Sequence, residues 1–574
     1  MAETLNEQTF VLPEPLAGEV AKAYEAWRSA GNTQRLWRKD ATLWTGGDEN
    51  QWLGWLDVDE NELRDVEMVQ EFGGELHAEG FTDVLLLGMG GSSLGPEVLA
   101  KTLGPAPNFP RLHVLDSTDP AQVRRFADRI NVARTLFVVA SKSGTTLEPN
   151  MLADYFFATA SAALGRGAGR HFVAITDPGS KLQKLAEERN FRRVFFGIRA
   201  IGGRYSVLSK FGLVPLAIIG HDVRAFLETA AAMARACRVD ATANNPAVAL
   251  GLTIGALTLH RRDKLTVAGS PSIAAFGAWA EQLVAESTGK DGKGVIPIVG
   301  EPLSDPSSYQ SDRLFVFLGD AAHPDMAQQR AVEHLIGAGH PVVRITVPSA
   351  AFLSQEFFRF EMATAVAGAV LGINPFDQPD VEASKIMTRE ITTAFEKTGS
   401  LPSVPPVFEQ DGISLFADER NAQELRRAGA TSTLESWLRA HFARLAEGDY
   451  FAILAYLDAE DARVEPLHRL RLAVRDKKRV ATCLQFGPRF LHSTGQAYKG
   501  GPNSGIFLQV TGTPVPDLAV PGRKVSFGIV EASQARGDFC VLAQRGRRIL
   551  NAHIGQDLGR GVARLAEAAR VALQ

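Results

Sequence analysis

Short, fully apolar segments alternate along this chain with longer stretches of helical length, and this alternation limits the possible folds more than any other feature. Such segments occur at residues 84–87, 112–115, 135–140 and 172–175, and again at 264–268, 314–318 and 342–347. Continuous apolar runs are typical of strands buried on both faces, and strands that alternate with helices form parallel sheets. We therefore expect an α/β protein with doubly wound parallel sheets.

The 574 residues exceed the size of one ordinary domain. The pattern divides them into a charged, tryptophan-rich N-terminal segment, two α/β units of similar plan, a linker and a C-terminal α/β region. Pro402, Pro405 and Pro406 mark the linker. The C-terminal region has its own apolar runs, at residues 450–457, 480–486, 505–510 and 549–554. The predicted boundaries are 1–65 (helical), 66–225, 226–398, 399–414 (linker) and 415–574.

The charge balance argues against several kinds of partner. A net charge of -4 is small for this length and predicts neither a nucleic-acid surface nor a polybasic membrane anchor. The apolar runs are too short to span a membrane, and residues 1–9 lack the pattern of a signal peptide. The few cysteines (Cys237, Cys483 and Cys540) form no CxxC pair and are expected to be reduced core residues, with disulfide or zinc use as the alternative. We expect a cytoplasmic protein.

A glycine-rich loop follows the first predicted strand, at residues 88–96 (GMGGSSLGP). Glycines let a backbone approach an anion closely, and the helix that follows offers free N–H groups. A tight strand–helix turn and a dinucleotide loop are the alternatives. The segment is not a Walker loop, because no Gly-Lys-Ser/Thr ends it.

A second loop, at residues 141–148 (SKSGTTLE), follows the strand that ends at Ala140. Its hydroxyl side chains and its lysine stand at the predicted start of a helix. Hydroxyls and backbone N–H groups can surround a phosphate. Helix capping is the alternative, but capping needs one such residue rather than four. Both loops fall at carboxyl ends of parallel strands, where open α/β sheets bind ligands.

Three further segments contain charged residues in unusual settings. Residues 202–207 (GGRYSV) place an arginine between a glycine pair and a helix start, where it could stabilise an oxyanion or simply pair with a surface carboxylate. Residues 282–290 (QLVAESTGK) end a predicted helix with a glutamate, which is often only solvated. Residues 374–385 (NPFDQPDVEASK) end in Lys385, which by itself is an ordinary exposed lysine.

In this order, the five segments resemble the signatures of the phosphoglucose isomerase family across roughly residues 80–390. The resemblance implies two sugar isomerase domains. It also implies that Glu286 is the catalytic base, that Arg204 stabilises an enediolate and that Lys385 assists ring opening. By the same resemblance the substrate would be bound by the remaining matched positions: Gly91, Ser92, Ser141, Lys142, Ser143, Thr145, Thr146 and Gln282.

The family's ring-opening histidine has no counterpart between Glu286 and Lys385. Residues 491–496 (LHSTGQ), beyond the linker, resemble the family's histidine segment but stand out of order. We hypothesise that the C-terminal region folds back and supplies His492. The alternative is that His492 belongs to a separate domain, in which case Tyr309 or Asp312 would be the next candidates.

The resemblance implies a glycolytic and gluconeogenic enzyme that interconverts glucose 6-phosphate and fructose 6-phosphate without metal or organic cofactor. The expected ligand is a sugar phosphate, and a homo-oligomer is compatible with the sequence. Two alternatives stay open: a dual phosphoglucose/phosphomannose isomerase, and a non-catalytic sugar-phosphate sensor. The chain resembles the isomerase half of fused transaldolase–phosphoglucose isomerases, but residues 1–65 are too few for a transaldolase barrel.

Overall fold

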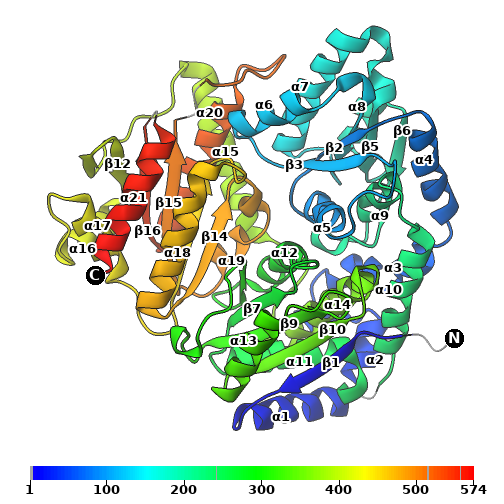
Figure 1. Ribbon diagram of the computed structural model, residues 1–574, viewed down its shortest axis with the longest axis horizontal. Helices are drawn as coiled ribbons and strands as arrows, with labels where there is room; N and C mark the ends of the chain where they lie inside the picture. The colour runs from blue at the N-terminus through cyan, green and yellow to red at the C-terminus, as the bar shows by residue number, and fades with distance from the viewer. Residues whose placement is uncertain (1–3, 241, 514–515, 556) are drawn as a thin grey trace.

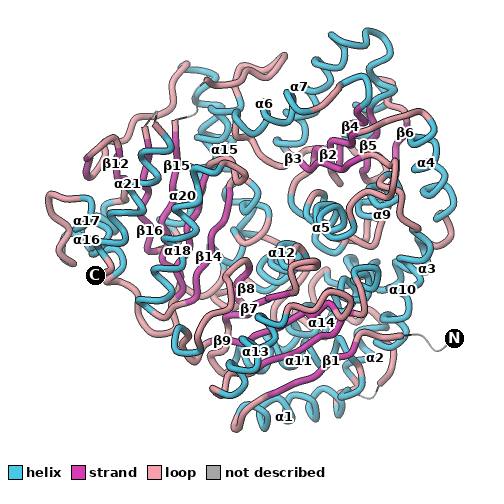
Figure 2. Tube along the Cα trace, in the orientation of Figure 1, coloured by secondary structure: helices cyan, strands magenta, loops and turns pink. Residues whose placement is uncertain are grey.

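The computed structural model describes residues 4–240, 242–513, 516–555 and 557–574. It is an α/β structure with three largely parallel sheets, which confirms the predicted fold class. The sheets form three separate groups of strands around a central region that contains helix α12 (Figures 1 and 2). Among the described helices, none combines the length and the apolar character needed to cross a membrane.

The first sheet has the strand order β3-β2-β4-β5-β6, and all its strands are parallel. Strands β2, β4 and β5 are buried along their whole length, as their continuous apolar sequences predict. The elements are β2 (Asp83–Leu87), β3 (Arg111–Leu115), β4 (Thr135–Ala140), β5 (Phe172–Thr176) and β6 (Arg193–Phe196), with helices α4 (Val66–Ala78), α5 (Leu94–Leu103), α6 (Pro120–Arg129), α7 (Leu147–Leu164), α8 (Lys181–Glu188) and α9 (Lys210–Ile218).

The second sheet has the order β1-β10-β9-β7-β8, and only β1 is antiparallel to its neighbour. The largest apolar core covers one side of this sheet and continues into the first unit. The elements are β1 (Glu7–Val11), β7 (Lys264–Gly269), β8 (Ile296–Val299), β9 (Arg313–Asp320) and β10 (Val342–Val347), with helices α10 (Val223–Cys237), α11 (Pro246–Leu259), α12 (Phe276–Thr288), α13 (Met326–Gly337), α14 (Leu353–Leu371) and α15 (Pro379–Thr398).

The third sheet has the order β11-β12-β16-β15-β13-β14, with β13–β16 parallel and a hairpin at one edge. The elements are β11 (Phe408–Gln410), β12 (Ile413–Phe416), β13 (Tyr450–Tyr456), β14 (Ala481–Phe486), β15 (Gly505–Gly512) and β16 (Arg548–Ile554), with helices α16 (Glu419–Arg427), α17 (Leu434–Phe442), α18 (Glu465–Lys478), α19 (Gly495–Gly500), α20 (Phe527–Gln544) and α21 (Leu558–Ala572).

Two local predictions from the sequence differ from the structure. The segment 1–65, expected to be helical, contains helices α1 (Leu16–Ser29), α2 (Asn32–Trp37) and α3 (Val58–Glu62), but it begins with strand β1, which pairs with β10. The expected linker 399–414 contains β11 and the start of β12. Asp411 and Gly412 both have positive φ, as a two-residue hairpin turn requires, so the Asp-Gly pair was the overlooked signal.

The second and third sheets are joined by a shared core rather than by a flexible contact. Ala285 of α12 and Ile296 of β8 pack in one cluster with Tyr450 of β13 and Ala481 of β14. Gly289, just after α12, lies so close to α19 that a Cβ atom there would be 2.2 Å from the Cα of Ala497. The C-terminal region therefore packs directly against the helix that carries Glu286.

Two adjacent glycines of α4 give a matched test of this packing. A Cβ atom at Gly73 would lie 2.1 Å from the carbonyl oxygen of Ala217 on α9, whereas one at Gly74 would meet nothing within 4 Å. We expect Gly73→Ala to destabilise the protein by about 2 kcal/mol or more, because the helices must separate. Gly74→Ala should stabilise it by about 0.5–1 kcal/mol through helix propensity. Thermal melting of both variants checks this, and equal melting temperatures would contradict it.

Candidate active site

The loop after strand β4 forms the first wall of the candidate site. Gly144 has a φ of +66°, and a Cβ atom there would lie 2.2 Å from the backbone nitrogen of Leu182, so only glycine fits. The Ser141 hydroxyl accepts the Gly144 N–H at 3.2 Å, and the hydroxyls of Ser143 and Thr145 lie 2.6 Å apart. Helix α7 begins directly after Thr146. The loop thus gathers hydroxyls at a helix N-terminus, which suits an anion.

A cavity of about 310 Å³ lies against this loop and is lined by all three α/β regions. Ser143, Thr145 and Thr146 come from the first, and Lys385 comes from α15 of the second. His492 and Gln534 come from the region after the linker. Because His492 lines the same cavity as the hydroxyl-rich loop within one chain, the geometry supports the hypothesis that the C-terminal region folds back onto the candidate site.

A chain of hydrogen bonds runs from His492 into the protein. The His492 ring nitrogen Nε2 donates to the Glu148 carboxylate at 2.9 Å. The Gln534 amide donates to the same Glu148 oxygen at 2.6 Å and accepts from the Thr118 hydroxyl at 2.8 Å. Burial alone would raise the pKa of Glu148, but the neighbouring His492 ring and its hydrogen bond hold this pKa below its usual value. The carboxylate therefore stays ionised beside the imidazole.

Gln282 connects His492 with the predicted catalytic base. Its amide nitrogen donates to Glu286 at 3.0 Å and to the backbone carbonyl of His492 at 2.8 Å. Gln282 and Glu286 are four residues apart on α12, so their side chains lie on the same face of the helix. The amide oxygen of Gln282 is buried and has no hydrogen-bond partner among the described residues, which leaves it free to bind a ligand.

Arg204 is buried beneath Glu286 and holds three segments together. Its guanidinium donates to the Ser287 hydroxyl at 2.8 Å, to the Gln378 amide oxygen at 2.9 Å and to the Pro375 carbonyl at 2.8 Å. It lies 3.5 Å from the Glu286 carboxylate. The positive charge therefore stands directly beside the predicted base, inside the protein.

The glycine-rich loop at residues 88–96 allows neighbouring segments to pack closely, in addition to any role in ligand binding. A Cβ atom at Gly91 would lie 2.0 Å from the carbonyl oxygen of Gly203, and one at Gly90 would lie 2.9 Å from the His492 carbonyl. Ser92, beside them, is buried. The loop thus packs against both the Arg204 segment and the His492 segment.

Not every predicted site residue lines the cavity. Ser143, Thr145, Thr146, Lys385 and His492 do; the other predicted positions (Gly91, Ser92, Ser141, Lys142, Arg204, Gln282 and Glu286) do not. The Lys142 ammonium instead lies 2.9 Å from Asp177 and donates to the Ile198 carbonyl, so its positive charge is paired with a carboxylate of the protein. The Lys385 ammonium lies 3.4 Å from Glu382 on a half-exposed side chain.

Sequence reasoning assigned no role to Glu148, Gln534 or Arg389, which also line the cavity. Glu148 stands inside the quoted loop motif, so its position was a usable signal. Gln534 belongs to a helix without any motif and could not have been found. The fallback candidates lie elsewhere: the Tyr309 hydroxyl accepts the Ser304 N–H, and Asp312 lies 3.7 Å from Lys264. Within the described residues, no group of His, Cys, Asp and Glu side chains is arranged to hold a metal ion.

Comparison with known proteins places this geometry in context. A sequence model of the family described as phosphoglucose isomerase matches residues 66–296. The glucose-6-phosphate isomerase of Rubrobacter xylanophilus is 31% identical over 376 residues, which cover 56% of this chain and 85% of that protein. The same enzyme from Synechococcus sp. (strain JA-3-3Ab) is 38% identical over 238 residues, covering 39% of this chain and 44% of the relative.

The chain thus spans about half the length, or less, of the first curated relatives that it matches. Two solved structures are similar. A hypothetical protein from Thermus thermophilus has a TM-score of 0.57 at 26% identity, and the match covers 67% of this chain and 99% of that protein. A glucose-6-phosphate isomerase from Chlamydia trachomatis has a TM-score of 0.51 at 24% identity, and the match covers 58% of this chain and 74% of that protein. At this identity the similarity supports the fold alone.

The hydrogen bonds of Arg204 generate a prediction about stability. We expect Arg204→Lys to cost on the order of 3 kcal/mol, because an ammonium cannot reproduce the planar set of bonds and leaves buried acceptors without partners. The melting temperature should fall by several degrees. The exposed Arg199, whose guanidinium donates to the Pro178 carbonyl, provides the matched control Arg199→Lys. Equal melting temperatures for the two variants would show that Arg204 does not hold the site together.

Proposed function

The chain belongs to the phosphoglucose isomerase family, and from this membership we propose that it interconverts glucose 6-phosphate and fructose 6-phosphate. The observation that carries the proposal is the placement of Glu286, Gln282 and His492 in one hydrogen-bonded group beside the hydroxyl-rich loop. A sugar-phosphate sensor would need that loop but not a buried carboxylate beside an arginine. A cytoplasmic, glycolytic role belongs to the same proposal.

In this proposal the phosphate of the sugar binds at the N-terminus of α7. Ser141, Ser143, Thr145 and Thr146 offer hydroxyls there, and the helix offers free N–H groups. This end of the substrate takes no part in bond changes. Its binding energy fixes the position of the reacting carbons relative to the side chains deeper in the site.

Ring opening is assigned to His492, with Lys385 at the same cavity. Opening moves a proton from the anomeric hydroxyl to the ring oxygen, and an imidazole suits this exchange near neutral pH. The ionised Glu148 accepts a hydrogen bond from His492 Nε2 and so fixes the orientation of the ring. Gln534 fixes Glu148 in turn.

Isomerisation is assigned to Glu286 and Arg204. Glu286 removes the proton from C2 of the open chain and returns it to C1, while a proton moves from O2 to O1, so that the atoms balance. The cis-enediolate between these steps carries negative charge, which the guanidinium of Arg204 stabilises from its buried position. The unpartnered amide oxygen of Gln282 is available to accept a substrate hydroxyl. Side chains alone supply the chemistry.

The decisive experiment is Glu286→Gln in an assay with fructose 6-phosphate. We expect turnover to fall by about 10²–10⁴-fold while sugar-phosphate binding persists, because the amide keeps the shape but cannot accept a proton. The matched control is Glu281→Gln on the same helix. Burial raises the pKa of Glu281 to about 7, so glutamine resembles its protonated form and near-normal turnover is expected. Unimpaired turnover in Glu286→Gln would move the base elsewhere.

A second experiment tests the phosphate loop. We expect Ser143→Ala with Thr146→Ala to raise KM by roughly 100-fold or more and to change kcat far less, because hydrogen bonds to a charged phosphate are worth about 1.5–3 kcal/mol each in both ground and transition states. Ser161→Ala, near the other end of α7, is the control and should leave KM unchanged. An unaltered KM in the double variant would contradict the assignment of the loop.

A further inference from the structure

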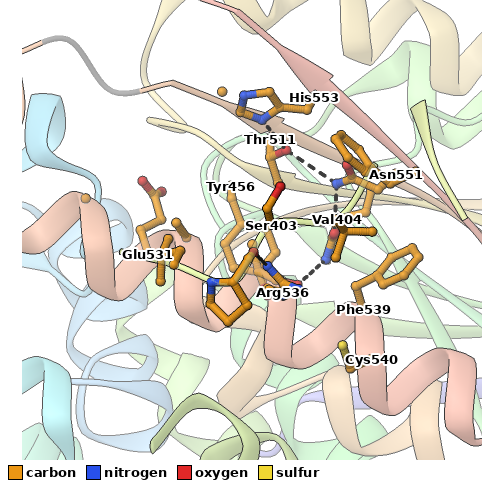
Figure 3. A pocket seen from close by; sticks show the side chains of 18 residues that line it. Ser403, Val404, Tyr456, Thr511, Glu531, Arg536, Phe539, Cys540, Asn551 and His553 are labelled. Atoms are coloured by element: carbon orange, nitrogen blue, oxygen red, sulfur yellow. Dashed lines mark hydrogen bonds between the residues drawn. The ribbon is translucent and has the colours of Figure 1, made fainter. Parts of the chain in front are cut away.

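The region after the linker contains a second cavity, of about 410 Å³, that shares no lining residue with the candidate active site. It lies between α20, the ends of strands β15 and β16, and residues 401–404 of the linker (Figure 3). Small-molecule sites usually have volumes of about 300–1,000 Å³. The activity proposed above makes no use of this space.

The cavity stands where a parallel sheet ordinarily binds ligands. Strand β13 leads into α18, which packs on one face of the third sheet, whereas β15 leads into α20, which packs on the other face. The neighbouring strands β13 and β15 therefore form a topological switch point, and ligands bind outside the carboxyl ends of such strands. Tyr456 ends β13 and Gly512 ends β15, and both line the cavity.

The sheet changes character where it meets the cavity. Phe507 and Ile549, deeper on the α20 side, are apolar, but the next residues on that face, Gln509 and Asn551, are polar amides. The Asn551 amide donates to the Gln509 side-chain oxygen at 2.9 Å. Thr511 and His553 continue this polar floor. A parallel sheet covered on both faces is normally apolar, so a polar floor at this point indicates a site for a ligand.

Two buried groups in the cavity lack partners. Within the described chain, the Tyr456 hydroxyl and one carboxyl oxygen of Glu531 accept or donate no hydrogen bond, although Tyr456 is 2% and Glu531 is 5% exposed. A buried polar group without a partner destabilises the fold, and a ligand that supplies the missing hydrogen bond is favoured. The apolar side chains of Phe416 and Phe539 line the same cavity. A ligand with a polar end and an apolar body would satisfy both kinds of surface.

The charges around these two groups are acidic. Burial, together with Asp119, Asp517 and Asp458, holds the pKa of Glu531 well above its usual value. The Tyr456 hydroxyl likewise has acidic neighbours, Glu531 among them. Arg536 is the cation of the cavity wall, and its guanidinium donates to the Pro402 carbonyl on the linker side (Figure 3).

We propose that this cavity binds a small organic cation, namely a protonated amine on an apolar, ring-bearing body. The ammonium group lies between Glu531 and Tyr456, and the body packs against Phe539 and Phe416, whose rings also attract a cation. Glu531 releases its proton to water as the ammonium group arrives, so that carboxylate and ammonium pair. An anionic ligand would meet the acidic end and is disfavoured.

Three probes of nearly equal shape test the charge that the cavity prefers. Phenethylamine, 2-phenylethanol and phenylacetate are titrated into the full chain at neutral pH and followed by calorimetry or NMR. We expect phenethylamine to bind at least about 10-fold more tightly than 2-phenylethanol, because a hydrogen bond between charged groups is stronger than one between neutral groups, and phenylacetate to bind most weakly. Tighter binding of phenylacetate, or no binding of any probe at about 10 mM, would overturn the proposal.

Two variants locate the binding. Glu531→Gln should remove the preference for amine over alcohol, and Ala532→Phe, which fills the cavity from the α20 wall, should abolish binding of both. Glu567→Gln, an exposed change on α21, is the control and should alter neither the preference for the amine nor the binding of the two probes. A preference that survives Glu531→Gln, or binding that survives Ala532→Phe in folded protein, would refute the site. Because binding is measured directly, a chain without isomerase activity would still test this inference.

Discussion

The candidate site depends on one amide group, the side chain of Gln282. Its two N–H bonds are shared between the Glu286 carboxylate and the His492 carbonyl, so a single planar group connects the predicted base with the segment that carries His492. An amide can do this because it offers two donors in fixed directions. Its remaining oxygen is buried and unpartnered in the described structure, which costs stability and leaves an acceptor ready for a ligand.

The rest of the site is built outward from this contact. Arg204 ties the end of α12 to residues 375–378. On the other side of the site, the hydrogen bond from Gln534 to Glu148 connects the C-terminal region with the first α/β region. Since no single region contains both the loop and His492, the third sheet is an integral part of the site rather than an appendage. This arrangement also explains why α12 lies at the centre of the molecule (Figure 1).

The sequence predicted those features that depend on local pattern. Buried strands such as β4 are continuous apolar runs, so the fold class could be read directly. The short edge strand β1 could not be predicted, because its five residues form a strand only by pairing with β10. Within the candidate site, the ion pair between Lys142 and Asp177 could not be predicted, because Asp177 is distant in sequence. Gln534 and Glu531 belong to a helix without a motif, and only the folded structure shows the two cavities that they line.

The pairing of β1 with β10 has a consequence for how the protein is made. Residues 7–11 are synthesised well before their partner strand, which follows more than 300 residues later. At typical rates of about 5–20 residues per second, the first strand waits roughly 20 to 70 seconds for its place in the sheet. During translation its backbone groups are unpaired, as is the edge of the growing sheet. A chain that stops before residue 342 would carry that N-terminal segment permanently exposed, which would mark the unfinished product for proteases.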